Sequence, residues 1–285
     1  MIEYIKAAII SIISGLFAPL PFSHSAGYSY LSYVLDFGQN SSLCIFYYSI
    51  ISIAFSLAVF FSLRKIYFKG FRALFSTKNS KIHNRSGYRK LMLNILISLL
   101  PAAVMAVPYS KDKIVLDLFN EQLGTTHLLV TALCCVGSGL FLLIAHWYTK
   151  QNFAQTKRSA DAKSLIRFSI YQIPAYFLPG VSCVSLGTTS FLISDIDSRV
   201  IVREMLTYIA PSMLTVNVVR LVRVCMSGGI IPNPIMIALC AVCAILGSIL
   251  MIRLLSKIDF RKTCIFFSIF SIIFGAAAAI ALFVM

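Results

Sequence analysis

The stretch GLFAPLPFSHS, residues 15–25, interrupts an apolar run with two prolines and follows them at once with serine. A second stretch, PAYFLPGVS at residues 174–182, repeats this pattern about 160 residues later. Proline removes a helical N–H and clashes with the preceding turn, so each stretch predicts a broken helix. The breaks are expected at Pro19, Pro21, Pro179 and Gly180. Broken helices at corresponding places in two halves of a membrane protein favour a binding site near the bilayer midplane.

The composition predicts an all-α polytopic membrane protein. Of the 285 residues, 59% are hydrophobic, whereas soluble domains have roughly 45–50%. Backbone polar groups inside a bilayer must be satisfied within helices or a closed barrel, and runs of about 20 apolar residues indicate helices. Six spans are expected, at 43–63, 91–108, 126–148, 205–225, 230–252 and 263–284. The two remaining apolar regions, 2–36 and 165–194, contain the breaks and are interpreted as re-entrant helical hairpins.

The distribution of lysine and arginine predicts the orientation. Residues 64–90 carry nine basic residues and no acidic ones, and residues 149–167 carry five. The segments expected on the opposite side hold only Lys111 and Lys113. Basic loops face the cytoplasm, so residues 64–90 and 149–167 are expected on the cytoplasmic side. The net charge of +15 therefore indicates topology and contact with anionic membrane lipids, and no nucleic acid is expected as a partner. An outer aromatic belt is expected from Tyr28, Tyr30, Tyr33, Tyr47 and Tyr48.

Spans and orientation together predict an inverted-topology repeat. Residues 1–148 form the first repeat, residues 149–164 a cytoplasmic linker, and residues 165–285 the second repeat. Each repeat consists of one re-entrant helical hairpin and three transmembrane helices, inserted in opposite directions. This arrangement recurs in transporters.

The motifs in these two segments resemble those of the bacterial undecaprenyl-diphosphate phosphatases, the BacA-type bacitracin-resistance proteins. The likeness extends to Tyr88-Arg89-Lys90 followed by Leu100-Pro101-Ala102-Ala103, and to Arg203 followed by Ile209-Ala210-Pro211. The resemblance implies a multi-pass protein of the bacterial cell membrane. It also implies a polyprenyl phosphate or diphosphate lipid of cell-wall synthesis as partner, and it is compatible with a homodimer.

The sequence departs from this family at the residues to which the resemblance assigns the chemistry. The two motif carboxylates fall on Ser14 and Ala18, the motif histidine on Gly27, and the motif arginine on Cys183. In the family these groups and a divalent metal are expected to share the cleavage of the diphosphate. No metal ligands and no cofactor are therefore predicted here, and a divalent metal is expected only if the chain is catalytically active.

Three adjacent residues, Ser23, His24 and Ser25, are the candidates for catalysis. A histidine beside a serine can act as a general base. The alternative, which the sequence favours, is that His24 is a polar residue that hydrogen-bonds the re-entrant turn.

A phosphate site is expected where the broken helices begin again, because helix N-termini present free N–H groups and a partial positive charge. The candidate ligand residues are Ser23, Ser25, Gly180, Ser182, Ser185, Thr188, Arg220 and Arg223. The serines and the threonine can equally cap their own helices. For Arg220 and Arg223 the favoured interpretation is that they extend to the lipid headgroups, and the alternative is that they hold phosphate in a cavity.

Four functions stay open. The first is a degenerate family member that binds, and translocates or sequesters, a polyprenyl phosphate lipid carrier. The second is an active undecaprenyl-diphosphate phosphatase with substituted site residues. The third is a transporter of an unrelated small anion. The fourth is a membrane scaffold for cell-envelope enzymes.

Overall fold

The computed structural model describes residues 2–38, 40–75, 85–110, 113–116, 128–150, 159–228, 231–258 and 260–284. Within these ranges six helical stretches are long and apolar enough to cross a membrane: Ser42–Ser62, Ser86–Met105, Leu128–Thr149, Val200–Met226, Pro234–Leu255 and Thr263–Leu282. They coincide with the six expected spans to within a few residues. The prediction of an all-α polytopic membrane protein is confirmed.

Five of these spans are continuous helices. They are α3 (Ser41–Ser62), α8 (Leu128–Lys150), α11 (Ser198–Met226), α12 (Pro234–Leu255) and α13 (Phe260–Val284). Asparagine side chains cap two of them, because Asn40 Oδ1 accepts from Ser42 N and Asn233 Oδ1 accepts from Ile235 N. Helix α11 contains Pro211 and continues through it.

The span expected at 91–108 is divided into two helices rather than continuous. It begins earlier, as α5 (Arg85–Ser98), and resumes after a break as α6 (Leu100–Met105). Pro101 lies in the first turn of α6, where its missing N–H costs no helical hydrogen bond, so it starts a new helix. A two-stranded antiparallel hairpin of β1 (Pro108–Ser110) and β2 (Lys113–Ile114) follows.

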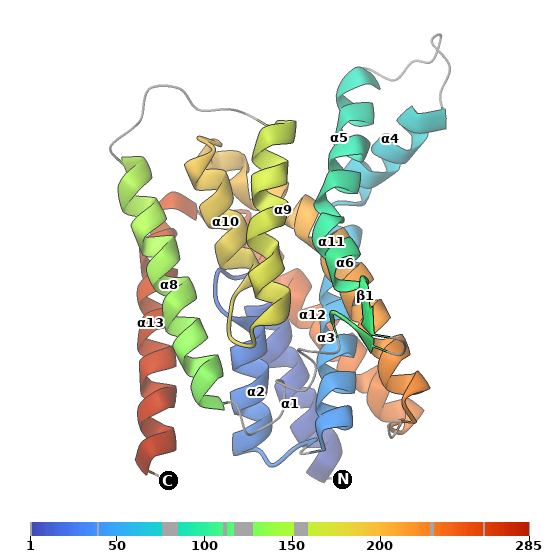
Figure 1. The fold of residues 1–285 in the computed structure, drawn as a ribbon, viewed down its shortest axis with the longest axis vertical. Coiled ribbons are helices and arrows are strands. Elements are labelled where there is room, and N and C mark those ends of the chain that lie inside the picture. The colour runs from blue at the N-terminus through green and yellow to red at the C-terminus, as the bar shows by residue number, and fades with distance from the viewer. Residues whose placement is uncertain are drawn as a thin grey trace.

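The two apolar regions with prolines are helical hairpins. The first consists of α1 (Ile2–Phe17) and α2 (His24–Val34), and the second of α9 (Ala162–Phe177) and α10 (Cys183–Ile193). In Figure 1 the first hairpin occupies the lower part of the molecule and the second the upper part, and their turns approach each other at mid-height. Both chain ends lie at the lower end. This placement is what oppositely inserted hairpins require, and the repeat relation between the halves stays a prediction.

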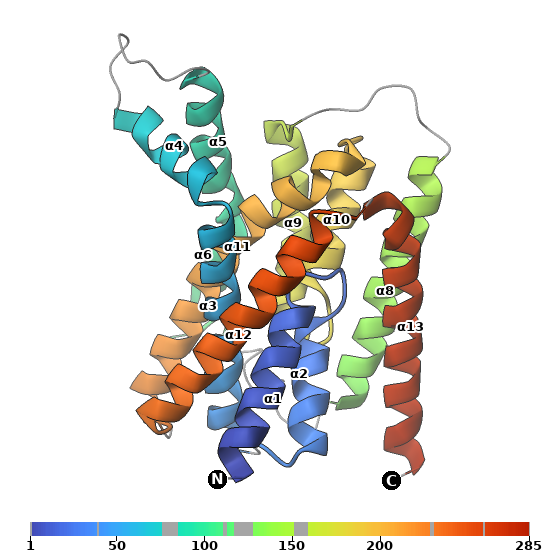
Figure 2. The same cartoon turned by 180° about the vertical axis from the view of Figure 1, so that it is seen from behind.

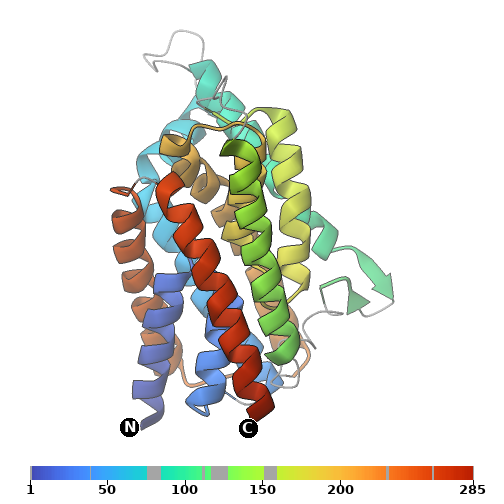
Figure 3. The same cartoon turned by 90° about the vertical axis from the view of Figure 1, so that its left-hand side faces the viewer.

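The predicted halves are packed into one bundle. The most extensive helix pairs are α8 with α13, α1 with α12, and α3 with α11, and each joins the two halves. Figure 2 shows α1 beside α12, and Figure 3 shows α13 running along α8. Small residues permit such close approach in membranes. A Cβ at Gly15 would lie 2.5 Å from the Ala244 carbonyl oxygen, and Ser248 Oγ donates to the Gly15 carbonyl oxygen at 3.0 Å.

Two expectations about the polar segments change. The basic region after α3 is partly helical, as α4 (Arg64–Phe75), rather than a loop. The expected linker at 149–164 is shorter in the described residues, since α8 extends to Lys150 and Asp161 caps α9; residues 151–158 lie outside the described part.

The expected outer aromatic belt is wrong for three residues. Tyr28, Tyr47 and Tyr48 are buried, and α3, which carries the last two, packs against α11 and α12.

Candidate functional site

The first broken helix ends at Phe17 and begins again at His24. Ser23 has an extended backbone and its hydroxyl accepts from the Ala26 N–H at 3.1 Å, so it is the N-cap of α2. Pro19 and Pro21 stand between the helices, where neither can supply the N–H that a continuous helix needs. The break therefore falls where the sequence places it.

The second broken helix ends at Phe177 and begins again at Cys183. Ser182 caps α10, because its hydroxyl accepts from the Ser185 N–H at 3.0 Å. Gly180 has a φ of +91°, a conformation that L side chains rarely adopt. A Cβ at Gly180 would lie 2.8 Å from the carbonyl carbon of Thr131 and closer still to its oxygen. Only glycine fits this turn against α8.

The two breaks are in direct contact. The Gly180 N–H donates to Ser25 Oγ at 2.9 Å, and Ser182 Oγ donates to the Phe22 carbonyl oxygen at 2.9 Å. Ser25 Oγ also lies 3.2 Å from Ser23 Oγ. The juxtaposition expected from the sequence is present, and the N-termini of α2 and α10 start from one shared polar cluster.

Arg220 is buried beside this cluster, with 4% of its surface exposed. Its guanidinium donates to Asn217 Oδ1 at 3.1 Å and to the Tyr176 carbonyl oxygen at 3.5 Å. It also stands 5.5 Å from the centroid of the Tyr48 ring, within cation–π range. The interpretation favoured from the sequence, that Arg220 extends to the headgroups, is wrong: the side chain points into the bundle.

A narrow recess of about 10 Å³, with room for about one water molecule, lies between Arg220 and the breaks. One side of the recess is formed by Ser25 from the first break, another by the turn of the second hairpin, and a third by the Arg220 guanidinium. The lining residues are Ser25, Tyr48, Ala175, Tyr176, Phe177, Leu178, Pro179 and Arg220. The buried guanidinium and the N-terminus of α2 favour an anion here, while the C-terminal turn of α9, which also lines the recess, presents carbonyl oxygens. Arg223, one turn further along α11, does not line this recess and is only partly buried.

His24 is buried at the same place and is 6% exposed. Neither of its ring nitrogens has a hydrogen-bond partner in the described structure, and its ring lies 5.1 Å from the Tyr48 ring. The Ser23 and Ser25 hydroxyls hydrogen-bond each other and backbone N–H groups instead of the imidazole. Catalysis by a histidine–serine pair requires that contact, so His24 and the two serines do not form such a pair in this conformation. The favoured alternative, a hydrogen bond from His24 to the turn, is also not formed.

The remaining sequence candidates hold the scaffold. Ser185 Oγ donates to the Ser138 carbonyl oxygen at 2.9 Å, which ties α10 to α8. Thr188 Oγ1 donates to the Val184 carbonyl oxygen at 2.7 Å, within its own helix. Neither residue lines the recess.

The residues present do not fit a divalent metal. Among the described residues no three histidine, cysteine, aspartate or glutamate side chains gather into a ligand set. Magnesium and calcium prefer oxygen ligands that include carboxylates, and the recess offers a serine hydroxyl, tyrosines and an arginine. The arginine's charge would oppose a cation.

Sequence reasoning missed Tyr48 and Tyr176 as lining residues and Asn217 as the partner that orients Arg220. Asn217 and Arg220 are three residues apart on α11, a spacing that puts both on one helix face. This polar pair inside an apolar span is the sequence feature from which an inward-facing Arg220 could have been predicted.

Comparison with known proteins gives a consistent result. Residues 7–277 match the model of the family described as "Bacitracin resistance protein BacA". The chain is 25% identical over 224 residues to the "Undecaprenyl-diphosphatase" of Lacticaseibacillus casei (strain BL23), covering 78% of this chain and 76% of that relative. The "Undecaprenyl-diphosphatase" of Lacticaseibacillus paracasei (strain ATCC 334) matches with the same identity and coverage.

Proposed function

Because this chain belongs to the bacitracin resistance protein BacA family, a family of multi-pass bacterial membrane proteins, we propose that it binds a polyprenyl phosphate or diphosphate lipid and translocates or sequesters it without cleaving it. The observation that carries the proposal is the buried Arg220 beside the contact between the two helix breaks. A phosphate headgroup that widened this recess would meet the Arg220 guanidinium and the Ser25 hydroxyl at the N-terminus of α2.

The positions of the missing family groups support the loss of cleavage. Ala18, at a motif carboxylate position, is 2% exposed in the apolar core. At Gly27, where the family motif has histidine, a Cβ would lie 2.8 Å from a ring carbon of Phe17 and 3.3 Å from one of Phe22. A histidine side chain does not fit there without displacing two aromatic rings.

Arg220 offers a replacement for the family's motif arginine, whose position is Cys183 here. Cleavage of a diphosphate needs charge neutralisation together with an activated water or nucleophile. Arg220 supplies the first, and the unpaired state of His24 leaves the second without an oriented base. This combination supports binding without turnover.

The active-phosphatase alternative is favoured by the names of the two relatives, and one experiment separates the two. The purified chain in detergent is mixed with farnesyl diphosphate, and released phosphate is measured; binding of geranylgeranyl phosphate is measured by calorimetry on the same sample. We expect binding and no phosphate release. Phosphate release that His24→Ala abolishes would establish the alternative and overturn the proposal.

The matched variants are Arg220→Gln and Arg223→Gln, which remove the same charge from the same helix. Losing a charge-assisted hydrogen bond costs about 1.5–3 kcal/mol, or roughly a 10- to 100-fold loss of affinity, and this loss is expected for Arg220→Gln only. Equal binding by both variants would remove the recess as the site. Failure of the parent chain to bind any isoprenoid phosphate would leave the small-anion transporter.

A further inference from the structure

A second polar cavity, of about 420 Å³, lies at the predicted cytoplasmic end of the bundle. Its walls come from α4, α5, α11 and the residues just before α9, and its polar lining includes Tyr88, Lys90, Asn94, Arg203, Glu204 and Tyr208. The volume is within the range of about 300–1,000 Å³ that is usual for small-molecule sites. It shares no lining residue with the recess at the helix breaks.

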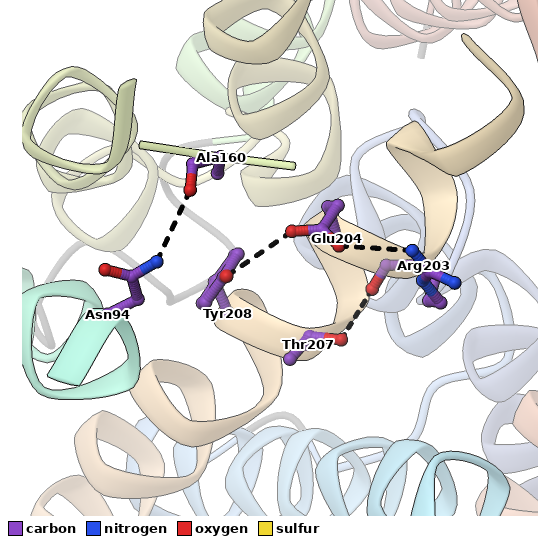
Figure 4. Close-up of polar contacts among 6 residues, drawn as sticks. All are labelled: Asn94, Ala160, Arg203, Glu204, Thr207 and Tyr208. Atoms are coloured by element: carbon purple, nitrogen blue, oxygen red, sulfur yellow. Dashed lines mark hydrogen bonds and ion pairs between the residues drawn. The ribbon is translucent and has the colours of Figure 1, made fainter. Parts of the chain in front are cut away.

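Hydrogen bonds fix the inner wall of this cavity (Figure 4). Glu204 is 8% exposed; one carboxylate oxygen accepts from the Tyr208 hydroxyl at 3.3 Å and the other pairs with Arg203 Nη2 at 3.4 Å. On the facing side Asn94 Nδ2 donates to the Ala160 carbonyl oxygen at 3.4 Å. Glu204 is the single carboxylate within the six candidate spans of the described chain.

The charges in the cavity favour an anion. Lys90 lines it and has no acidic partner among the described residues. Arg203 uses one NH2 group to hydrogen-bond Glu204. A guanidinium has five N–H donors in a planar fork that matches phosphate oxygens, so donors remain for a ligand. The one carboxylate is already bound by Arg203 and Tyr208, so the cavity retains an excess of positive charge.

We propose that this cavity is a second anion site, which takes a phosphate group through Lys90 and Arg203. The ligand is a phosphate monoester or diphosphate, carried by a lipid headgroup or free. The inference rests on the proposed function, because it supplies the cytoplasmic station that a translocated headgroup needs. Glu204 pairs with the half-exposed Arg203 guanidinium at the wall of the cavity.

Polar contacts on α11 lie between this cavity and the recess at the breaks. Ser212 Oγ lies 3.4 Å from the Tyr208 carbonyl oxygen and 2.9 Å from the Tyr176 hydroxyl. The Tyr176 carbonyl oxygen in turn accepts from Arg220 at 3.5 Å. Tyr208 and Arg220 are about 18 Å apart along the helix axis at about 1.5 Å per residue. One helix therefore carries both anion stations.

The test uses the full-length chain in detergent and three probes: geranylgeranyl phosphate, inorganic phosphate and uncharged geranylgeraniol. Calorimetry on the parent chain is expected to show two classes of sites for geranylgeranyl phosphate. Lys90→Gln with Arg203→Gln should weaken one class by roughly 10- to 100-fold, and Arg220→Gln should weaken the other. Competition by inorganic phosphate at the Lys90 class would identify free phosphate as a ligand, and its absence would assign the site to the lipid headgroup.

The control is Lys65→Gln with Lys69→Gln, which removes two exposed positive charges from α4 outside the cavity. Lys90→Gln alone, at an exposed lysine, keeps the test valid if the double variant does not fold. Cavity variants that bind as the control does would overturn the inference, as would equal affinity for geranylgeraniol. If the cavity variants lose binding while Arg220→Gln does not, the second site stands and the recess is not a phosphate site.

Discussion

Gly180→Ala tests the contact on which the candidate site depends. The substitution places a Cβ against the backbone of Thr131, whose carbonyl carbon would be 2.8 Å away, in a residue with φ of +91°. It is also expected to break the hydrogen bond from the Gly180 N–H to Ser25 Oγ, which is 2.9 Å long. Backbone strain costs about 1–3 kcal/mol, the forced overlap another 1–3 kcal/mol or so, and the hydrogen bond about 1 kcal/mol.

The expected loss in free energy of unfolding is therefore roughly 3–7 kcal/mol. Two other glycines separate the causes. Gly228 has a φ of +72° with nothing within 4 Å of an added Cβ, so Gly228→Ala carries the backbone strain alone. Gly137 has nothing within 4 Å and lies inside α8, so Gly137→Ala is expected to stabilise by about 0.5–1 kcal/mol.

The assay is thermal unfolding of the three variants in the same detergent, followed by circular dichroism. We expect the Tm to fall most for Gly180→Ala, by about 6 °C or more on the scale of 2–4 °C per kcal/mol found for soluble proteins, less for Gly228→Ala, and to rise slightly for Gly137→Ala. Equal losses for Gly180→Ala and Gly228→Ala would refute the reasoning, because the approach to Thr131 would then carry no cost.

Three further predictions concern the same core. His24→Phe removes two buried ring nitrogens that lack hydrogen-bond partners. The Tm should therefore rise by the equivalent of about 1–3 kcal/mol, while the affinity for a phosphate lipid should not improve. A lower Tm would show that the imidazole does have hydrogen-bond partners. Ser182→Ala removes the N-cap of α10 and the hydrogen bond to the Phe22 carbonyl oxygen, so the free energy of unfolding should fall by about 2–3 kcal/mol. Ser185→Ala loses only the hydrogen bond to the Ser138 carbonyl oxygen and should cost about 1 kcal/mol. Similar unfolding midpoints of the two variants in denaturant would contradict this order. Gly15→Ala pushes a Cβ to 2.5 Å from the Ala244 oxygen and should lower the Tm by the equivalent of about 1–3 kcal/mol, and unchanged melting would mean that α1 and α12 separate easily.

The sequence predicted the elements whose cause is local. Apolar runs of about 20 residues mark the spans because the bilayer sets their length. Pro19, Pro21 and Pro179 mark the breaks because each lacks an N–H, and Ser23 and Ser182 mark the helix starts because a hydroxyl after the break can accept a backbone N–H. These signals require no knowledge of the neighbouring helices.

The site itself was only partly predictable. Ser25, Gly180 and Ser182 were named from the sequence and do join the two breaks. Ser185 and Thr188 were named for the same chemistry, but they turn toward α8 and their own helix. Hydroxyl residues look alike in a sequence, and the face that each presents depends on the packing of its helix.

Only the tertiary structure decided where the charges and rings point. Arg220 lies in the last turns of a span, from which it could extend to the headgroups or turn inward; packing of α11 against α3 places it over Tyr48 instead. Glu204 forms a cavity wall because α5 and the start of α9 converge on α11. Hydropathy fixes how deep a residue lies in the membrane, whereas its direction around the helix axis is set by contacts between helices that are distant in sequence.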